Sequence, residues 1–509
     1  MAGNKAVALN MMANTISFVF ASVVSFFLTP YITSHVGIEA YGLVGLANSF
    51  ISYVTLFTAA LNSMASRFIV IEIHNSHFSE ANKYFSSVLI ANTLIALFLI
   101  IPAIWLIFNL DKINVSQSLM FDAQITFSLV ILSFFFSSVG AFYGVVLYAK
   151  NILYKGSFRT VESGIIRIIL ILLLFSLLDT RIFYVCVATF IAGLYPLIWN
   201  IRYTHRLLPE LKVSVSSFSI KAIKTLTSSG IWNSVTNLSH LLLDGLDLVL
   251  CNIFISGTMT GNVAIAKTVP GLFVSLIAVL SGSFYPQFLE LYSKKLKDAL
   301  SVSINNSINI LSAISGVCLS ILIIYSRDFY TLWLPGEDSR LLSILTILAL
   351  GTVLMSCCIY SLFSVFALSN KVKMNSLVMV ATGVLSIITT FICLKATNWG
   401  VYAIVGVSSI FGILRNLFFT PIYAAHCLGL PKLYFYKRIS INLINVGIIL
   451  VFAFLIKSIL PVHSWGLLIS NFFIIAILGS LLSLFTVFNR QQRQSLIKAV
   501  KDRIHKQTD

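Results

Sequence analysis

The sequence predicts an all-helical integral membrane protein with 14 transmembrane helices. Of its 509 residues, 58% are hydrophobic and only 10% are charged, and the mean hydropathy is +0.95. A soluble domain contains about 25% charged residues, so this chain is too apolar to have water as its main solvent. Its charged residues lie in short clusters between long apolar runs. This composition excludes a disordered chain, a disulfide-stabilised secreted module and a soluble enzyme.

Fourteen apolar runs are long enough for membrane helices, because a helix needs about 20 apolar residues to cross the hydrocarbon core. They do not alternate as barrel strands do, and helices satisfy their own backbone polar groups in lipid. The first run follows Lys5 closely and has no small-residue cleavage site, so we expect a retained span rather than a signal peptide. The runs are 8–33, 42–64, 85–109, 124–148, 160–178, 182–200, 227–252, 262–288, 303–325, 341–368, 374–394, 400–424, 440–460 and 465–488.

The basic residues predict the orientation of these spans. With the N-terminus in the cytoplasm, the cytoplasmic segments hold 25 of the 34 Lys and Arg residues, and the outside segments hold six. This asymmetry follows the positive-inside rule and places both termini in the cytoplasm. A net charge of +17 would suggest nucleic acid on a soluble protein, but here we expect none. The basic tail at 489–509 is interpreted as an anchor that touches anionic lipid.

We expect two parallel, pseudo-symmetric lobes of six helices each, followed by a C-terminal helix pair. An offset of 219 residues pairs Asn14 with Asn233 and Gly42 with Gly261. Since six spans separate the copies, both cross the membrane in the same direction, and such repeats have a pseudo-twofold axis along the membrane normal. The predicted parts are an N-terminal lobe at 1–201, a cytoplasmic linker at 202–226, a C-terminal lobe at 227–424, a hairpin at 440–488 and the basic tail at 489–509.

The seventh span carries a stripe of polar residues. Their spacings of 4, 3, 4 and 3 place them on one face of an α-helix over about 21 Å. We expect this stripe, together with Asn14 of the first span, to line a hydrated substrate cavity between the lobes, because polar residues within a membrane are costly. Hydrogen bonding between helices is the alternative. The stripe consists of Asn233, Asn237, His240, Asp244 and Asp247.

Three basic residues lie inside spans. Lys267 is at the same depth as Asp244 and Asp247, so we expect an ion pair, which is either a gate or a structural bridge. Pro270, one turn from Lys267, is a candidate hinge. Arg167 and Arg415 are candidate ligands for a phosphate group, and snorkelling to the interface is the favoured alternative for Arg415 but not for Arg167.

The seven cysteines fall in or beside spans at no metal-ligand spacing, so we expect neither a disulfide framework nor a metal site. The chain has no nucleotide-binding loop of the Gly-x-x-x-x-Gly-Lys-Ser/Thr type, and we expect no cofactor. Coupling to H⁺ or Na⁺ is left open.

Two segments resemble those of a known family. The first hairpin reads Thr-Pro-Tyr-Ile-Thr-Ser-His-Val-Gly-Ile-Glu-Ala-Tyr-Gly-Leu over residues 29–43, and the second half contains Ser-Gly-Ile-Trp at 229–232. These features resemble the Wzx polysaccharide flippases, whose superfamily includes the MATE multidrug exporters and the lipid II flippase. Fourteen spans place this chain at the long end of the Wzx-type proteins, many of which look like twelve-span chains.

The resemblance implies a flippase of the bacterial inner membrane and not an enzyme. Its substrate would be an undecaprenyl-pyrophosphate-linked oligosaccharide, such as an O-antigen repeat unit, moved outward by alternating access. The implied partners are this lipid-linked oligosaccharide, membrane lipids, and the polymerase and chain-length machinery of polysaccharide biosynthesis. The first alternative is a MATE-like H⁺- or Na⁺-coupled multidrug antiporter. The second is a membrane-embedded sugar polymerase or ligase, which would be expected to carry a larger outside loop with catalytic groups.

Overall fold

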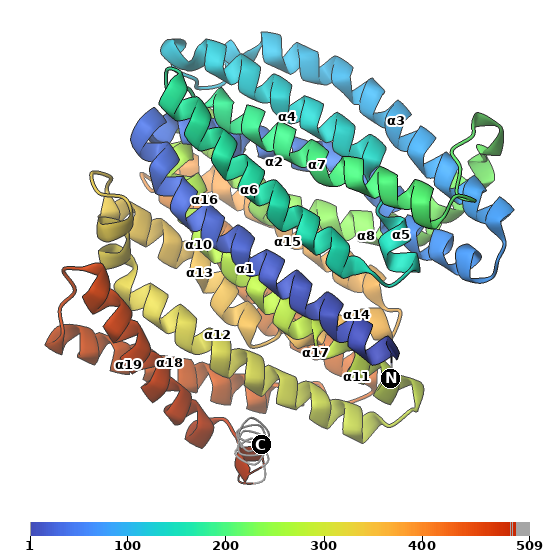
Figure 1. Ribbon diagram of the computed structural model, residues 1–509. Coiled ribbons are helices and arrows are strands. Elements are labelled where there is room, and N and C mark those ends of the chain that lie inside the picture. The colour runs from blue at the N-terminus through green and yellow to red at the C-terminus, as the bar shows by residue number, and fades with distance from the viewer. Residues whose placement is uncertain (1, 489, 491, 495–509) are drawn as a thin grey trace, which may run out of the picture. The chain divides into compact units, whose positions relative to one another are not determined.

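The protein is helical throughout the residues that the computed structural model describes, which are 2–488, 490 and 492–494, with side chains from residue 9 onward except that of Asp244. Fourteen helices in this part of the chain are long and apolar enough to cross a membrane, which confirms the predicted number of spans (Figure 1). Most of the predicted basic tail at 489–509 lies outside the described residues.

The helices gather into two compact units, which are described separately. Unit 1 comprises Met1–Ile265 and Ser376–Ile404, and unit 2 comprises Ala266–Asn375 and Val405–Asp509. The boundaries fall within three helices, α10 (Gly257–Gly282), α15 (Val372–Ala396) and α16 (Val401–Leu414). The predicted six-helix lobes, separated by residues 202–226, stay a prediction.

Unit 1 contains the first seven spans and is held together by several small apolar cores. One core joins α2, α3, α5 and α8, and another joins α1, α6 and α7. A hydrogen bond also joins α1 to α6 beside the second of these cores. The side chain of Asn10 on α1 accepts it from the Tyr154 N–H of α6 at 2.9 Å. The elements are α1 (Ala2–Val36), α2 (Ile38–His74), α3 (Phe78–Phe108), η1 (Leu110–Lys112), η2 (Gln117–Leu119), α4 (Met120–Gly140), α5 (Val145–Ala149), α6 (Leu153–Leu177), α7 (Phe183–Leu207), η3 (Val215–Ser217), α8 (Ile220–His240), η4 (Leu241–Gly245) and α9 (Asp247–Phe254).

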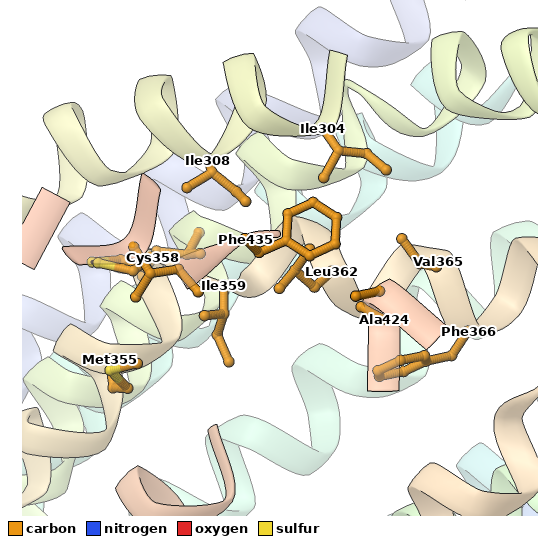
Figure 2. Packing of buried hydrophobic residues seen from close by; sticks show 14 of the residues in the cluster. Ile304, Ile308, Met355, Cys358, Ile359, Leu362, Val365, Phe366, Ala424 and Phe435 are labelled. Atoms are coloured by element: carbon orange, nitrogen blue, oxygen red, sulfur yellow. The ribbon is translucent and has the colours of Figure 1, made fainter. Parts of the chain in front are cut away.

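Unit 2 is built around one large apolar core and a second, smaller one. Figure 2 shows the ring of Phe435 next to Ile304, Ile308 and Leu362, which come from α12 and α14. The C-terminal hairpin of α18 and α19 packs on α12, and Lys457 forms an ion pair with Asp328. The elements are α11 (Tyr285–Ser293), α12 (Lys297–Trp333), α13 (Ser339–Cys357), α14 (Tyr360–Leu368), η5 (Arg415–Phe419), α17 (Thr420–Leu428), α18 (Tyr436–Ile459) and α19 (Trp465–Thr486).

Three predicted spans are interrupted by turns, and one of them is the run at 262–288, which divides into α10 and α11. The run at 124–148 was expected to be one helix, but α4 ends at Gly140 and a separate short helix, α5, follows. A Cβ at Gly140 would lie 1.9 Å from the Cδ1 atom of Leu197, so the side chain of Leu197 on α7 occupies the space beside this glycine. The run at 341–368 likewise divides into α13 and α14. Apolar runs set the length of the span, but they do not reveal such breaks.

Several helices also extend beyond their apolar runs. The second span, expected at 42–64, belongs to α2, which reaches from Ile38 to His74. The fifth span, expected at 160–178, belongs to α6, which begins at Leu153. Their polar end turns remain helical because backbone hydrogen bonding continues past the apolar segment.

Candidate functional site

A cavity of about 540 Å³ lies inside unit 1, among α2, α4, α6 and α7. Aromatic and aliphatic side chains form much of its wall, including Phe134, Phe190 and Leu197. The described residues that line it include no Asp or Glu. The polar groups of the wall are Asn48 of α2, Ser133 and Ser137 of α4, Arg167 of α6, and Thr189 and Asn200 of α7.

Arg167 provides the positive charge of this cavity. It lies 14 residues into α6, which is about 21 Å from the start of the helix. The helix begins seven residues before the expected run, so Arg167 is farther from the start of the helix than the sequence predicted. The buried Nε atom of Arg167 has no hydrogen-bond partner among the described residues. Arg167 as a whole is half-buried, and a cation inside a membrane span with one donor left without a partner favours an anion in the cavity.

Arg159, two turns earlier on α6, has a contrasting environment. It donates hydrogen bonds to Glu162 Oε2, to Tyr195 Oη at 2.9 Å and to Tyr203 Oη at 3.3 Å. Its guanidinium also lies 4.1 Å from the centre of the Trp199 ring. The α6–α7 pair therefore provides Arg159 with several side-chain partners, whereas Arg167 lines a cavity and its Nε has none among the described residues.

The polar stripe of the seventh span is divided by a π-helical turn at Leu241–Gly245. A π turn takes more residues than an α turn, so the uninterrupted spacing assumed for the stripe does not hold. Asn237 and His240, before the turn, are exposed, whereas Asp247, after it, is buried. The side chain of Asp244 lies outside the described residues.

Residues before that turn pack against neighbouring helices of unit 1. A Cβ at Gly230 would lie 1.9 Å from the carbonyl oxygen of Ala60, so α8 touches the backbone of α2. Thr236 and Ser376 share a hydrogen bond of 2.7 Å between α8 and α15. Asn233 is half-buried. The sequence predicted neither of these contacts, because nothing in the pattern of α8 identifies its neighbours.

The other candidate residues are placed as follows. Asn14 of α1 is exposed and accepts a hydrogen bond from Ser157 of α6. Hydrogen bonding between helices was the alternative to lining the cavity. Lys267 is half-buried and belongs to unit 2, whereas Asp247 belongs to unit 1, so their ion pair stays a prediction. Pro270 lies within the continuous helix α10. Its role as a hinge also stays a prediction.

Arg415 is buried in unit 2 and does not extend to the surface of that unit. It lies at the start of a second π-helical turn, Arg415–Phe419, and donates to Asn416 Oδ1 through Nε at 3.1 Å and Nη2 at 2.8 Å. Asn416 in turn donates to Ser356 of α13 at 3.1 Å. These hydrogen bonds hold the guanidinium beside Asn416, and the snorkelling that the sequence favoured for Arg415 stays a prediction.

The predicted outer ends of α2 and α10 meet at two pairs of small residues. A Cβ at Gly42 would lie 2.7 Å from the backbone of Gly261, and one at Gly45 would lie 3.3 Å from the Cβ of Ala264. Both pairs are 219 residues apart, which is the offset at which the two halves align. Equivalent residues of two repeats touch each other only at their twofold axis. This contact, which the sequence did not predict, is what a parallel repeat would form there.

The loop between the third and fourth spans reinforces this closed end. Asn114 donates through its backbone N–H to Asn252 Oδ1 at 3.1 Å and through Nδ2 to the Asn252 carbonyl at 2.6 Å. Asn252 donates back to the Asn114 carbonyl at 3.2 Å. Glu39 of α2 accepts hydrogen bonds from both the N–H and the hydroxyl of Ser116. The loop thus ties the outer ends of α2 and α9 together.

Among the described residues, no group of three His, Cys, Asp or Glu side chains is placed to hold a metal ion. The arrangement instead offers a guanidinium, amides and hydroxyls in a largely apolar cavity. Such groups bind and orient an anion and do not activate a nucleophile.

Comparison with solved structures shows a known transporter fold. The chain is similar to a structure titled the lipid II flippase MurJ in its inward closed conformation, with a TM-score of 0.69 and 18% identity over 93% of this chain and 98% of that one. It is also similar to an inward-facing multidrug resistance MATE transporter of the MOP superfamily, with a TM-score of 0.62 and 14% identity over 86% and 98%. A third is a MOP superfamily transporter from Pyrococcus furiosus, whose title describes reverse polarity of its binding pocket, at a TM-score of 0.60 and 13% identity over 86% and 96%.

Sequence comparison indicates the family. A protein of Bacillus subtilis strain 168, described as the uncharacterized membrane protein EpsK, is 26% identical over 491 residues, which are 96% of this chain and 97% of that protein. The profile of the family described as polysaccharide biosynthesis protein matches residues 6–292, more than half of the chain. The family and the fold are those of membrane transporters and not of catalytic enzymes. The chain therefore belongs to the polysaccharide biosynthesis protein family, as a multi-pass membrane protein with the helical fold of the MOP superfamily.

Proposed function

We propose that this protein is a flippase for lipid-linked oligosaccharides, and that its substrate is an undecaprenyl-pyrophosphate-linked repeat unit of a surface polysaccharide such as O-antigen. It works in the bacterial inner membrane with both termini in the cytoplasm, and it moves the headgroup from the cytoplasmic to the outer leaflet. The membership of the family and the fold shared with a lipid II flippase support this function. The polymerase and chain-length machinery are its proposed partners.

The position of Arg167 in the cavity wall, with a buried Nε donor that has no hydrogen-bond partner among the described residues, is the observation that carries this proposal. The diphosphate is the part of such a substrate whose transfer into the membrane core costs the most free energy, because it is charged. A positive group in a cavity at mid-helix depth offsets the desolvation of that charge. Asn48, Thr189 and Asn200 supply hydrogen bonds around it, as a sugar or phosphate oxygen requires.

The membrane potential contributes to the driving force. With the cell interior negative, each negative charge that moves outward gains about 2.3 kcal/mol per 100 mV. Two phosphate charges would gain roughly 4–5 kcal/mol without nucleotide hydrolysis. Coupling to H⁺ or Na⁺ would add to this, and Asp244 and Asp247 are the acidic groups proposed to carry it.

Alternating access gives the remaining candidate residues their roles. The closed α2–α10 contact at Gly42 and Gly261 is the proposed outer gate, which must open to release the headgroup. Pro270 of α10 is the proposed hinge, and Lys267 is the proposed gate partner of the two aspartates. Arg415, Asn14, Asn233, Asn237 and His240 are proposed to contact the substrate as the cavity changes shape.

A multidrug antiporter of the MATE type is a less suitable alternative. An exporter of cationic drugs needs carboxylates where the cation binds. The described wall of the cavity in unit 1 provides an arginine and no Asp or Glu. The polarity of this cavity therefore favours an anionic headgroup.

A flipping assay in proteoliposomes tests the proposal. A fluorescent polyprenyl-diphosphate oligosaccharide is incorporated, and its exposure to an external quencher is followed over time. We expect flipping of the diphosphate lipid and none of a polyprenyl-linked sugar that lacks phosphate. Equal rates for both lipids, or no flipping of either by a folded protein, would refute the proposed substrate class.

The gate is tested with a pair of cysteines at Gly45 and Ala264, beside the contact of Gly42 with Gly261. Oxidation should join α2 to α10 and stop flipping, and reduction should restore it, because a Cβ at Gly45 would lie 3.3 Å from the Cβ of Ala264, close to the separation in a disulfide. A matched control joins Asn10 of α1 to Asn151, two residues whose side chains hydrogen-bond at 2.8 Å inside unit 1 at the other end. Unchanged flipping by the oxidised Gly45–Ala264 pair would show that this contact does not open during transport.

A further inference from the structure

A second cluster of basic and aromatic residues lies at the ends of α6 and α7, outside the cavity of Arg167. Figure 1 shows α6 and α7 running side by side. Basic side chains of both helices lie over aromatic rings of α7. The Trp199 and Tyr203 rings lie 5.6 Å apart on α7. Lys155 lies 5.6 Å from the centre of the Tyr203 ring, and Arg202 lies 5.5 Å from that of Trp199.

The charges of this cluster do not cancel. Glu162 pairs with Arg159, so these two contribute no net charge. Lys155 and Arg202 have only their ring contacts, and neither forms an ion pair within the described residues. Two positive charges therefore remain on either side of an aromatic shelf. At the opposite end of α7 the corresponding cation is neutralised, because Arg181 pairs with Asp122 at 3.0 Å.

The depth of the cluster is that of a membrane interface. Lys155 lies two residues after the start of α6, and Arg202 lies five residues before the end of α7. Both residues lie just outside the apolar runs at 160–178 and 182–200, where phospholipid headgroups are expected. Tryptophan and tyrosine are also the side chains that prefer this depth.

An apolar surface continues from the cluster along α7. Ile191, Ile198 and Arg202 follow one another on one face, since their spacings of seven and four residues keep the same side of a helix. Ile191 and Ile198 are 44% and 49% exposed. A cation at the headgroup level followed by exposed aliphatic residues matches the phosphate and the acyl chains of one lipid.

We propose that Lys155, Arg202 and the Trp199–Tyr203 shelf form a binding site for the phosphate of an anionic phospholipid, such as phosphatidylglycerol, in the leaflet that faces the cytoplasm. The phosphate lies between the two cations, and the acyl chains lie along α7. Arg202 is exposed, the other three residues of the site are half-buried, and the site continues into an exposed apolar face of α7, which favours a bilayer lipid over the transported substrate. The site does not depend on what the protein transports.

Trp199 provides a built-in reporter for this site. The full-length protein is reconstituted into nanodiscs that contain phosphatidylcholine and increasing fractions of brominated phosphatidylglycerol, whose bromine quenches nearby indoles. The difference between the wild type and Trp199→Phe isolates the signal of Trp199. We expect brominated phosphatidylglycerol to quench this signal at an apparent affinity about tenfold higher than brominated phosphatidylcholine, because each cation near the surface adds attraction for an anionic lipid.

Matched pairs of variants distinguish a defined site from general electrostatic attraction. Lys155→Ala with Arg202→Ala should abolish the preference for phosphatidylglycerol. Lys150→Ala with Arg206→Ala removes two exposed charges from the same end of unit 1, and it should keep the preference within twofold. Circular dichroism of each variant verifies that it is folded.

Three outcomes would overturn the inference. The absence of a preference in the wild type would mean that no anionic site exists. An equal loss of the preference for phosphatidylglycerol in both double variants would mean that the overall positive charge of the protein attracts the lipid. Displacement of phosphatidylglycerol from Trp199 by a polyprenyl diphosphate would assign the site to the substrate. None of these readings requires transport, so a failure here leaves the flippase proposal unaffected, and a failure of the flipping assay leaves this site unaffected.

Discussion

Two arginines of the helix α6, Arg159 and Arg167, have contrasting environments. Around Arg159, α6 and α7 provide a carboxylate, two tyrosine hydroxyls and an indole ring. Around Arg167, the same two helices and their neighbours α2 and α4 leave a cavity, and the buried Nε atom has no partner in the described residues. The first region is complete without a ligand, whereas the second would gain stability from an anion. The comparison shows that neighbouring side chains of α6 and α7 can provide hydrogen-bond partners for an arginine. They provide none for the Nε atom of Arg167.

The largest effect is expected from Arg167→Ala. The flipping rate of a diphosphate-linked substrate should fall at least about tenfold, since removing one member of a desolvated charge pair is costly. The free energy of unfolding should stay the same or rise, because the variant no longer buries an unpaired charge. The flipping assay and thermal unfolding in detergent measure these two quantities.

Arg340→Ala, which removes an exposed charge, is the control and should flip normally. A normal rate for Arg167→Ala, or a loss of stability that accounts for the loss of flipping, would contradict the contrast drawn between the two arginines.

Arg159→Ala should produce the opposite pattern. It removes charged hydrogen bonds to Glu162 and to two tyrosines, of which the Glu162 contact is partly screened by solvent. We expect the free energy of unfolding to fall by about 1–2 kcal/mol and the rate per folded molecule to change little. Arg206→Ala is the exposed control at the same end. A large loss of rate in a stable Arg159→Ala protein would show that Arg159, too, contacts the substrate.

Arg167→Lys sharpens the comparison by keeping the charge. Lysine cannot donate two parallel hydrogen bonds to a phosphate, so we expect a rate about threefold lower than that of the wild type and above that of Arg167→Ala. The same flipping assay compares the three proteins. If the lysine variant is as slow as the alanine variant, the geometry of the guanidinium matters more than its charge.

The smallest effect is expected from Glu162→Gln. The Arg159 guanidinium keeps its tyrosine and indole contacts, and Glu162 is 40% exposed, so the free energy of unfolding should fall by only about 0.5 kcal/mol. Glu80→Gln removes a similar but more exposed pair with Lys83 and serves as the control in thermal unfolding. A loss well above that of the control would mean that the cluster around Arg159 is tightly coupled.

Much of the fold could be predicted from the sequence, and less of the candidate site. The 14 spans are confirmed, because hydrophobic length is a local property of the chain. Arg167 was identified as a candidate because a charge inside a span is rare. The lining residues Asn48, Thr189 and Asn200 were missed, although each is a polar residue within or beside an apolar run. A search for all such residues would have found them, but it could not have grouped them into one cavity.

The polar stripe of the seventh span shows a different limit. Its even spacing assumed a regular α-helix through Gly245, whereas a π turn lies at Leu241–Gly245. Arg415 begins a second π turn and is held by Asn416. Such turns depend on how neighbouring helices pack, since a π turn weakens the local hydrogen bonding and persists only where other contacts compensate. Spacing along the chain therefore could not reveal them.

The sequence by itself determined that this is a membrane protein, how many times it crosses the membrane, and which charged residues lie within the apolar segments. Each of these follows from sums over neighbouring residues, because transfer from water to lipid depends on the composition of the segment. Only the tertiary structure decided that Arg159 is satisfied and Arg167 is not, and that Gly42 meets Gly261. These facts depend on side chains that lie tens to hundreds of residues apart in the chain, and only packing brings them within hydrogen-bond or van der Waals distance.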